Sequence, residues 1–121
     1  MEESHIARTE ILDMGLDDAT GLYEILWRFN TLWPDMDIGK KYQLADETLR
    51  ELLALDAVDI IRERSENDQR YYEPVDQEKQ GEILRSPVSW YPGISDDPWS
   101  RISYETTDIG EALYRDFRRR E

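Results

Sequence analysis

The feature that most constrains the fold is the run from Lys40 to Pro74, where a helix pattern passes directly into a hairpin pattern. Apolar residues at helical spacing predict a helix over Lys40–Leu55, with a buried face made of Tyr42, Ala45, Leu49, Leu52 and Leu53. A strand is predicted over Ala57–Arg64, and Gln69–Val75 is predicted to return as its partner. The residues between them, 65–68, are Ser, Glu, Asn and Asp, which favour tight turns. This order predicts a helix packed on an antiparallel hairpin.

The remaining segments add helices and one further strand to this unit. We expect helices over Ser4–Met14, Asp17–Trp33, Asp76–Arg85 and Asp108–Arg119, and a third strand over Trp99–Thr106. A strand over Ile6–Leu12 is the alternative for the first helix. Residues 76–100 connect the hairpin to this third strand, and the second half of the segment is rich in proline and aromatic residues. At 121 residues the length fits one domain, and the expected class is α+β with helices on a small antiparallel sheet.

Two segments carry a resemblance to a known superfamily. Residues 47–59 place an amphipathic helix directly before a strand, and residues 104–114 place a strand before a Thr-x-x-Gly helix start at Thr107 and Gly110. In this order they resemble winged-helix proteins, particularly small regulators of the MarR and PadR kind. The resemblance implies a winged-helix-like domain over 1–121, with the hairpin as its wing and residues 76–100 as an insertion. It also implies that the helix over residues 40–55 is the recognition helix of a helix-turn-helix-like unit.

Such a recognition helix and wing would carry the contacts with DNA or with a partner protein. The candidate binding residues are Lys40, Lys41, Gln43, Arg50, Arg62 and Arg64. Glu47 and Glu51 lie on the same helix and interrupt that surface with negative charge. The alternative is a solvated helix flank on which these charges pair with one another.

The charge of the chain argues against a nucleic-acid partner. It carries 28 acidic and 15 basic residues, a formal net charge of −13, whereas DNA binding requires a positive surface. The wing tip at 65–68 is acidic, although residues 38–64 as a whole are close to neutral with five basic and six acidic residues. High acidity is also a habit of proteins from salt-adapted cells, which is the alternative explanation for the charge.

Aromatic residues form a second candidate surface. The candidate partner-binding aromatic residues are Tyr23, Trp27, Trp90, Tyr91 and Trp99. Tyr23 and Trp27 are four residues apart on a predicted helix, and the other three lie in the proline-rich half of the insertion. The alternative for Tyr23 and Trp27 is packing against the N-terminal segment. For the other three, the alternative is a lid that packs over the sheet and fills the edge of the core.

Catalytic and membrane functions find no support in the sequence. The chain has no cysteine, a single histidine (His5), and no phosphate-binding loop, nucleophile elbow or metal-binding helix motif. Adjacent carboxylates are frequent in so acidic a chain, and the Asp-x-Asp-x-Gly run at 35–39 lacks the remaining ligands of a calcium loop. We therefore expect no enzyme, cofactor or metal site. No apolar run approaches 18 residues, so we expect no membrane association and a soluble, cytoplasmic protein.

These observations lead to three hypotheses about function. The first is a non-enzymatic winged-helix-like protein-interaction or accessory regulatory module, which binds another protein or a second copy of itself. The second is a DNA-binding transcriptional regulator. The third is an acidic DNA mimic that blocks the DNA-binding surface of another protein.

Overall fold

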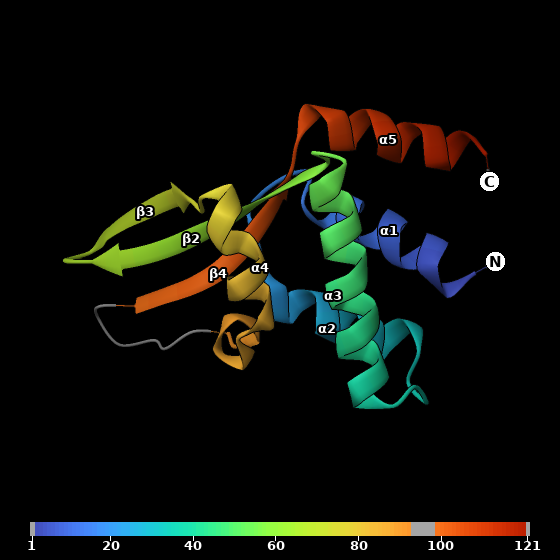
Figure 1. Cartoon of the computed structure of the whole chain (residues 1–121), viewed down its shortest axis with the longest axis horizontal. Coiled ribbons are helices and arrows are strands. Elements are labelled where there is room, and N and C mark those ends of the chain that lie inside the picture. Colours follow the sequence, from blue (N-terminus) through green and yellow to red (C-terminus); the bar gives the residue numbers. More distant parts are fainter. Residues whose placement is uncertain (1, 93–98, 121) are drawn as a thin grey trace.

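An antiparallel sheet with the strand order β1-β4-β2-β3 organises the molecule (Figure 1). The computed structural model describes residues 2–92 and 99–120. The strands are β1 (Thr20–Gly21), β2 (Val58–Glu66), β3 (Gln69–Pro74) and β4 (Trp99–Thr106). The helices are α1 (Glu3–Met14), α2 (Leu22–Leu32), α3 (Ile38–Ala54), α4 (Gln77–Arg85), the short 3-10 helix η1 (Pro87–Trp90) and α5 (Asp108–Arg119). The expected α+β class with helices on an antiparallel sheet is confirmed.

The hairpin predicted after α3 is confirmed, with a tighter turn. β2 and β3 pair from Ile61 opposite Pro74 to Glu66 opposite Gln69, so the turn is Asn67 and Asp68 alone rather than residues 65–68. Both turn residues have positive φ angles, 52° and 64°. Asn and Asp tolerate this left-handed conformation, and a two-residue turn of this kind matches the twist of the paired strands.

The predicted third strand is also confirmed, and it lies on the other side of β2 from β3. β4 pairs with β2 from Val58 opposite Thr106 to Ser65 opposite Trp99. The chain therefore leaves the edge strand β3, passes through α4 and η1 over one face of the sheet, and returns beside β2 (Figure 1). We keep the name insertion for the part of this detour that the structure describes between the two strands, residues 76–92.

The helix predicted over Asp17–Trp33 begins later than expected. Residues 20 and 21 form β1, which pairs with Tyr104 and Ser103 of β4, and α2 starts only at Leu22. The side chain of Glu24 accepts a hydrogen bond from the backbone N–H of Gly21 and so caps the helix at this point. Sheet pairing thus replaces the first turn of the predicted helix. The helical reading of α1 is confirmed, and its strand alternative is wrong.

The core lies between three helices and the inner strands. Its largest fully buried side chains include Ile11 and Leu12 of α1, Leu22, Ile25 and Phe29 of α2, Leu49 and Leu52 of α3, and Ile60 and Tyr104 of the sheet. Tyr104 donates a hydrogen bond of 2.7 Å to the carbonyl of Ile11, which ties β4 to α1. Burial raises the pKa of Tyr104 well above its usual value. No helix of the described residues has the length and apolar character needed to cross a membrane.

The C-terminal helix is anchored at the point predicted by the Thr-x-x-Gly motif. The hydroxyl of Thr107 accepts a hydrogen bond from the N–H of Gly110 and donates one to the carbonyl of Asp56. A Cβ atom built on Gly110 would lie 2.0 Å from the carbonyl oxygen of Ala57. Glycine at this position therefore allows α5 to pack directly on the backbone that joins α3 to β2.

Candidate partner-binding surface

The inward face of α3 runs through Lys41 and not through Tyr42, contrary to the sequence prediction. Lys41 is 5% exposed, and its Nζ donates a hydrogen bond of 2.8 Å to Oδ1 of Asn30 on α2. Tyr42 is 37% exposed and flanks the core instead. The buried positions 41, 45, 48, 49 and 52 form one helical stripe, and the long stem of lysine lets a charged residue occupy its end. Lys41 is thus unavailable to DNA or to a partner.

Arg50 is held by contacts inside the molecule. Its Nε lies 3.0 Å from each carboxylate oxygen of Asp46, one turn earlier on α3. Its Nη2 donates a hydrogen bond of 3.1 Å to the carbonyl of Gly81 on α4. The guanidinium therefore joins α3 to the insertion, and the insertion covers the flank of α3 that carries Arg50.

The candidate cations of the hairpin are only partly available. Arg64 forms ion pairs with Glu66 and Glu73 at 2.8 and 2.9 Å, and its guanidinium lies 4.5 Å from the centre of the Tyr71 ring. The hydrogen bond with Glu73 is the main cause that raises the pKa of Arg64. Arg62 is exposed and forms no ion pair with any residue of the described part of the chain.

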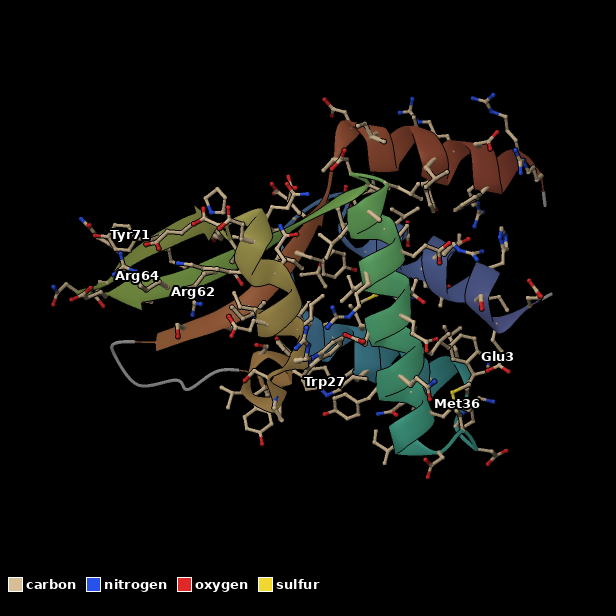
Figure 2. All side chains as sticks on the ribbon, in the orientation of Figure 1. Glu3, Trp27, Met36, Arg62, Arg64 and Tyr71 are labelled. Carbon is tan, nitrogen blue, oxygen red and sulfur yellow. The ribbon has the colours of Figure 1, made fainter. Side chains whose placement is uncertain are left out.

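The six candidate residues do not form one positive surface. Lys40 lies near Glu3, with Nζ 3.8 Å from the carboxylate. Figure 2 shows Glu3 at the opposite end of the molecule from Arg62 and Arg64, which lie on the hairpin. The solvent-facing stripe of α3 contains Lys40, Gln43, Glu47 and Glu51, with Gln43 hydrogen-bonded to Glu47 and Glu51 paired with Arg8. This stripe carries two acids and one base, so it would repel a phosphate backbone.

The predicted aromatic patch is also divided among different environments. Trp90 is buried, and its Nε1 donates a hydrogen bond of 3.0 Å to the carbonyl of Leu84, so it belongs to the core. Tyr91 is exposed. Tyr23 and Trp27 make an edge-to-face contact on α2, and Trp27 is 60% exposed. The side chain of Trp99 lies outside the described residues.

A hollow of about 460 Å³ on the sheet side of the molecule is bordered by acids. It is lined by Asp17, Asp18, Asp59, Glu105, Ile61, Tyr72 and Pro74, among others. Asp59 and Glu105 lie directly opposite each other on β2 and β4. Neither has a cationic partner within the described residues. These like charges are a feature of the general acidity of the chain and destabilise the strand pairing.

The insertion forms a groove with α3, which we call the aromatic groove. It has a volume of about 510 Å³ and is lined by Tyr42, Gln43, Asp46, Leu84, Arg85, Pro87, Trp90 and Tyr91. The rings of Tyr42 and Trp90 meet edge to face with centroids 5.8 Å apart. Its size and aromatic walls are those of a pocket that takes apolar groups. Tyr42 was missed as a surface residue because its spacing placed it with the buried apolar side chains.

A buried ion pair on the sheet is the strongest polar cluster, and its groups bind one another. Glu63 accepts hydrogen bonds from the side chains of Arg101 and Ser103, and Arg101 also donates to the hydroxyl of Tyr23. Burial lowers the pKa of Arg101, but hydrogen bonding and attraction to Glu63 outweigh it and raise the pKa overall. With every strong hydrogen-bonding group of this cluster engaged, it serves to join β2, β4 and α2.

The described residues contain no group of three or more His, Asp or Glu side chains placed to hold a metal ion. Comparisons with protein families, with curated proteins and with solved structures found no match.

Proposed function

We propose that this chain is a non-enzymatic, winged-helix-like interaction module that binds a partner protein through the aromatic groove. The observation that carries the proposal is the position of the insertion against α3. α4 binds Arg50 through the carbonyl of Gly81, and η1 places Trp90 against Tyr42. The helix that would read DNA in a winged-helix protein is thus part of a groove suited to an apolar side chain.

The winged-helix-like assignment rests on the order and pairing of the elements. A helix, α3, leads into the hairpin of β2 and β3, and β4 then leads through the Thr107 cap into α5. The insertion between β3 and β4 adds the helices α4 and η1, which line the groove. The order of the elements supports the resemblance to winged-helix proteins. The added helices change the surface around α3, where such proteins would contact DNA.

The charges of α3 and the hairpin favour a protein partner over DNA. Of the cations that a DNA-binding surface would use, Lys41 is buried, Arg50 is bound to Asp46 and Gly81, and Arg64 is bound to two glutamates. Lys40 lies beside Glu3. Of the candidate cations, Arg62 is therefore the one that remains for a phosphate contact. Non-specific DNA affinity comes chiefly from neutralising several phosphates together, and these residues do not gather for that purpose.

The partner segment is expected to combine an apolar side chain with basic flanks. An aromatic or aliphatic anchor fits between Tyr42, Pro87 and Tyr91, where half-exposed rings offer large contact areas. Basic flanks complement a chain with a net charge of −13 and would speed association at low salt.

The test begins with the identification of a partner and continues with purified components. Proteins captured from a lysate of the native host, in its own salt, are identified, and the affinity of each purified candidate is measured by calorimetry. Tyr91→Gln and Tyr42→Gln should each weaken binding about tenfold or more, as expected for interface anchors. The control Ile109→Gln alters an apolar residue on α5 that is about as exposed as Tyr91, and it should leave the affinity unchanged.

The DNA alternative is tested by a mobility-shift titration at low salt with random and host genomic DNA. The proposal expects no binding at micromolar protein. Binding that weakens steeply with salt, and is lost in a Lys40→Ala, Arg62→Ala double variant, would replace it with a DNA-binding regulator.

A further inference from the structure

The outer edge of β3 is open in the described part of the chain. β3 is the last strand of the sheet, and all six of its residues are exposed. Figure 1 shows no other helix or strand alongside its outer edge. An open edge presents unpaired backbone N–H and C=O groups that can pair with another strand.

The register of the hairpin identifies which backbone groups face outward. The N–H of Val75 donates a hydrogen bond of 3.0 Å to the carbonyl of Ile60, so residues 60 and 75 form a hydrogen-bonded pair. In an antiparallel ladder such pairs alternate with pairs that make no backbone hydrogen bonds. Tyr72, opposite Glu63, is therefore in a non-bonded pair and directs its N–H and C=O away from β2. The same alternation directs the backbone N–H and C=O of residue 70 outward. Pro74 also lies in a non-bonded pair, so the open edge lacks an N–H group at that position.

We propose that β3 pairs with β3 of a second copy, antiparallel and centred on Tyr71, to form a continuous eight-stranded sheet. In this register the outward backbone groups of Tyr72 meet those of Arg70 in the second copy, twice by symmetry. Four backbone hydrogen bonds result. A two-fold axis perpendicular to the sheet keeps corresponding faces together, as closed dimers require.

The side chains of β3 are complementary in this register, which is why a second copy is the expected occupant. Arg70 lies opposite Tyr72 of the other copy, a cation beside an aromatic ring. Gln69 lies opposite Glu73, an amide donor beside a carboxylate. Arg70 never faces Arg70, and Glu73 never faces Glu73. Pro74 falls beyond the paired residues, so its missing N–H costs nothing.

This contact uses a different surface from the aromatic groove, so each proposal can fail without the other. Two chains of charge −13 repel each other, and salt screens that repulsion. We therefore expect sedimentation equilibrium to show a dimer whose dissociation constant falls as NaCl rises from 0.1 to 1 M. A wild-type chain that stays monomeric at millimolar concentration in 1 M NaCl would overturn the proposal.

A proline substitution tests the backbone ladder directly. Tyr72→Pro removes an N–H that β2 does not use, and proline is tolerated at such edge positions. It should weaken dimerisation about tenfold or more, because each dimer loses two donors. Tyr72→Val removes the same ring, keeps the N–H and should dimerise more tightly than Tyr72→Pro. Circular dichroism checks that both variants remain folded, and equal dimerisation of the two would exclude the ladder.

A cross-link tests the register, since the chain has no native cysteine. In the proposed register, residue 71 lies opposite residue 71 of the second copy in a non-bonded pair. The Cα atoms of such a pair lie about 4.5 Å apart, within the range of a disulfide. Tyr71→Cys should form a covalent dimer rapidly under mild oxidation. Glu47→Cys, on the exposed stripe of α3, should not. Equal rates for the two variants, or a Tyr71→Cys chain that stays monomeric, would contradict the register.

Discussion

The carboxylate of Glu63 on β2 is bound by the guanidinium of Arg101 on β4, and only 3% of the Glu63 side chain reaches solvent. Ser103 donates a second hydrogen bond to the same oxygen, and Arg70 lies 3.9 Å from the other oxygen. A buried carboxylate is costly unless its charge and lone pairs are matched, and here residues from β3 and β4 match them. The pair therefore joins three neighbouring strands at the centre of the sheet.

Removal of the cation from this pair should destabilise the fold. Arg101→Met leaves a buried carboxylate without its main partner and should lower the free energy of unfolding by about 3–5 kcal/mol. Arg115→Met, which breaks an exposed pair with Glu111, should cost at most about 0.5 kcal/mol. Urea denaturation measures both. Equal losses for the two variants would show that the Glu63 cluster adds nothing beyond a surface ion pair.

Leu49 and Leu52 were predicted to be core residues, and both are fully buried. Leu→Ala at either position should lower the free energy of unfolding by about 2–5 kcal/mol, through lost burial and the cavity left behind. Leu55→Ala, at a half-exposed position after α3, is the control and should cost less than about 1 kcal/mol. Unchanged thermal midpoints for both core variants would mean that the faces of α3 are assigned wrongly.

Two glycines should respond in opposite directions to the same substitution. Gly110→Ala places a methyl group against the carbonyl of Ala57 and should cost about 1–3 kcal/mol through overpacking. Gly81→Ala places its methyl group 3.5 Å from the Arg50 guanidinium, an ordinary contact inside a helix. It should stabilise α4 by about 0.5–1 kcal/mol. Thermal unfolding separates the two, and a destabilised Gly81→Ala would mean that α4 is not a helix at that point.

Tyr104 should make the protein sensitive to alkali. Its pKa is raised well above 10.0 in the folded state by burial, so above pH 10 the unfolded state releases this proton first. The contribution of the Tyr104 proton to the free energy of unfolding is complete below about pH 10. It declines with rising pH by up to about 1.4 kcal/mol per pH unit. Tyr104→Phe should remove this part of the slope in urea titrations at pH 9–11.5, whereas the exposed Tyr42→Phe should retain it.

A charge reversal in the like-charge pair of Asp59 and Glu105 should stabilise the fold. Glu105→Lys places a cation opposite Asp59 and should raise the free energy of unfolding by about 0.2–1 kcal/mol. Asp35→Lys makes the same charge change in the loop between α2 and α3 and controls for the lower net charge. If both substitutions stabilise equally, the gain reflects total charge and not the cross-strand pair.

The sequence by itself determined those helices and strands that are specified by residues close together in the chain. The helical spacing of α2 and α3, the turn-forming residues between β2 and β3 and the Thr107 cap of α5 each depend on neighbours a few residues away. Such periodicities and turn preferences act locally, so they can be read without knowledge of the partner elements. For the same reason the α+β class and the order of helix, hairpin, strand and helix were predicted correctly.

Only the tertiary structure decided which candidate residues remain available for binding. In the sequence, Lys41 and Arg50 both resemble solvent-facing cations. In the structure, Lys41 is bound to Asn30 and Arg50 bridges to Gly81. Trp90 became core because η1 packs against α2, α4 and β4. Tyr42 became surface because Lys41 takes the end of the buried stripe of α3. Each of these outcomes depends on long-range contacts, whose partners a local pattern does not specify. The groove and the open edge of β3 arise from that same long-range packing, in which the segment after β3 crosses one face of the sheet and β4 pairs with β2 on the side away from β3.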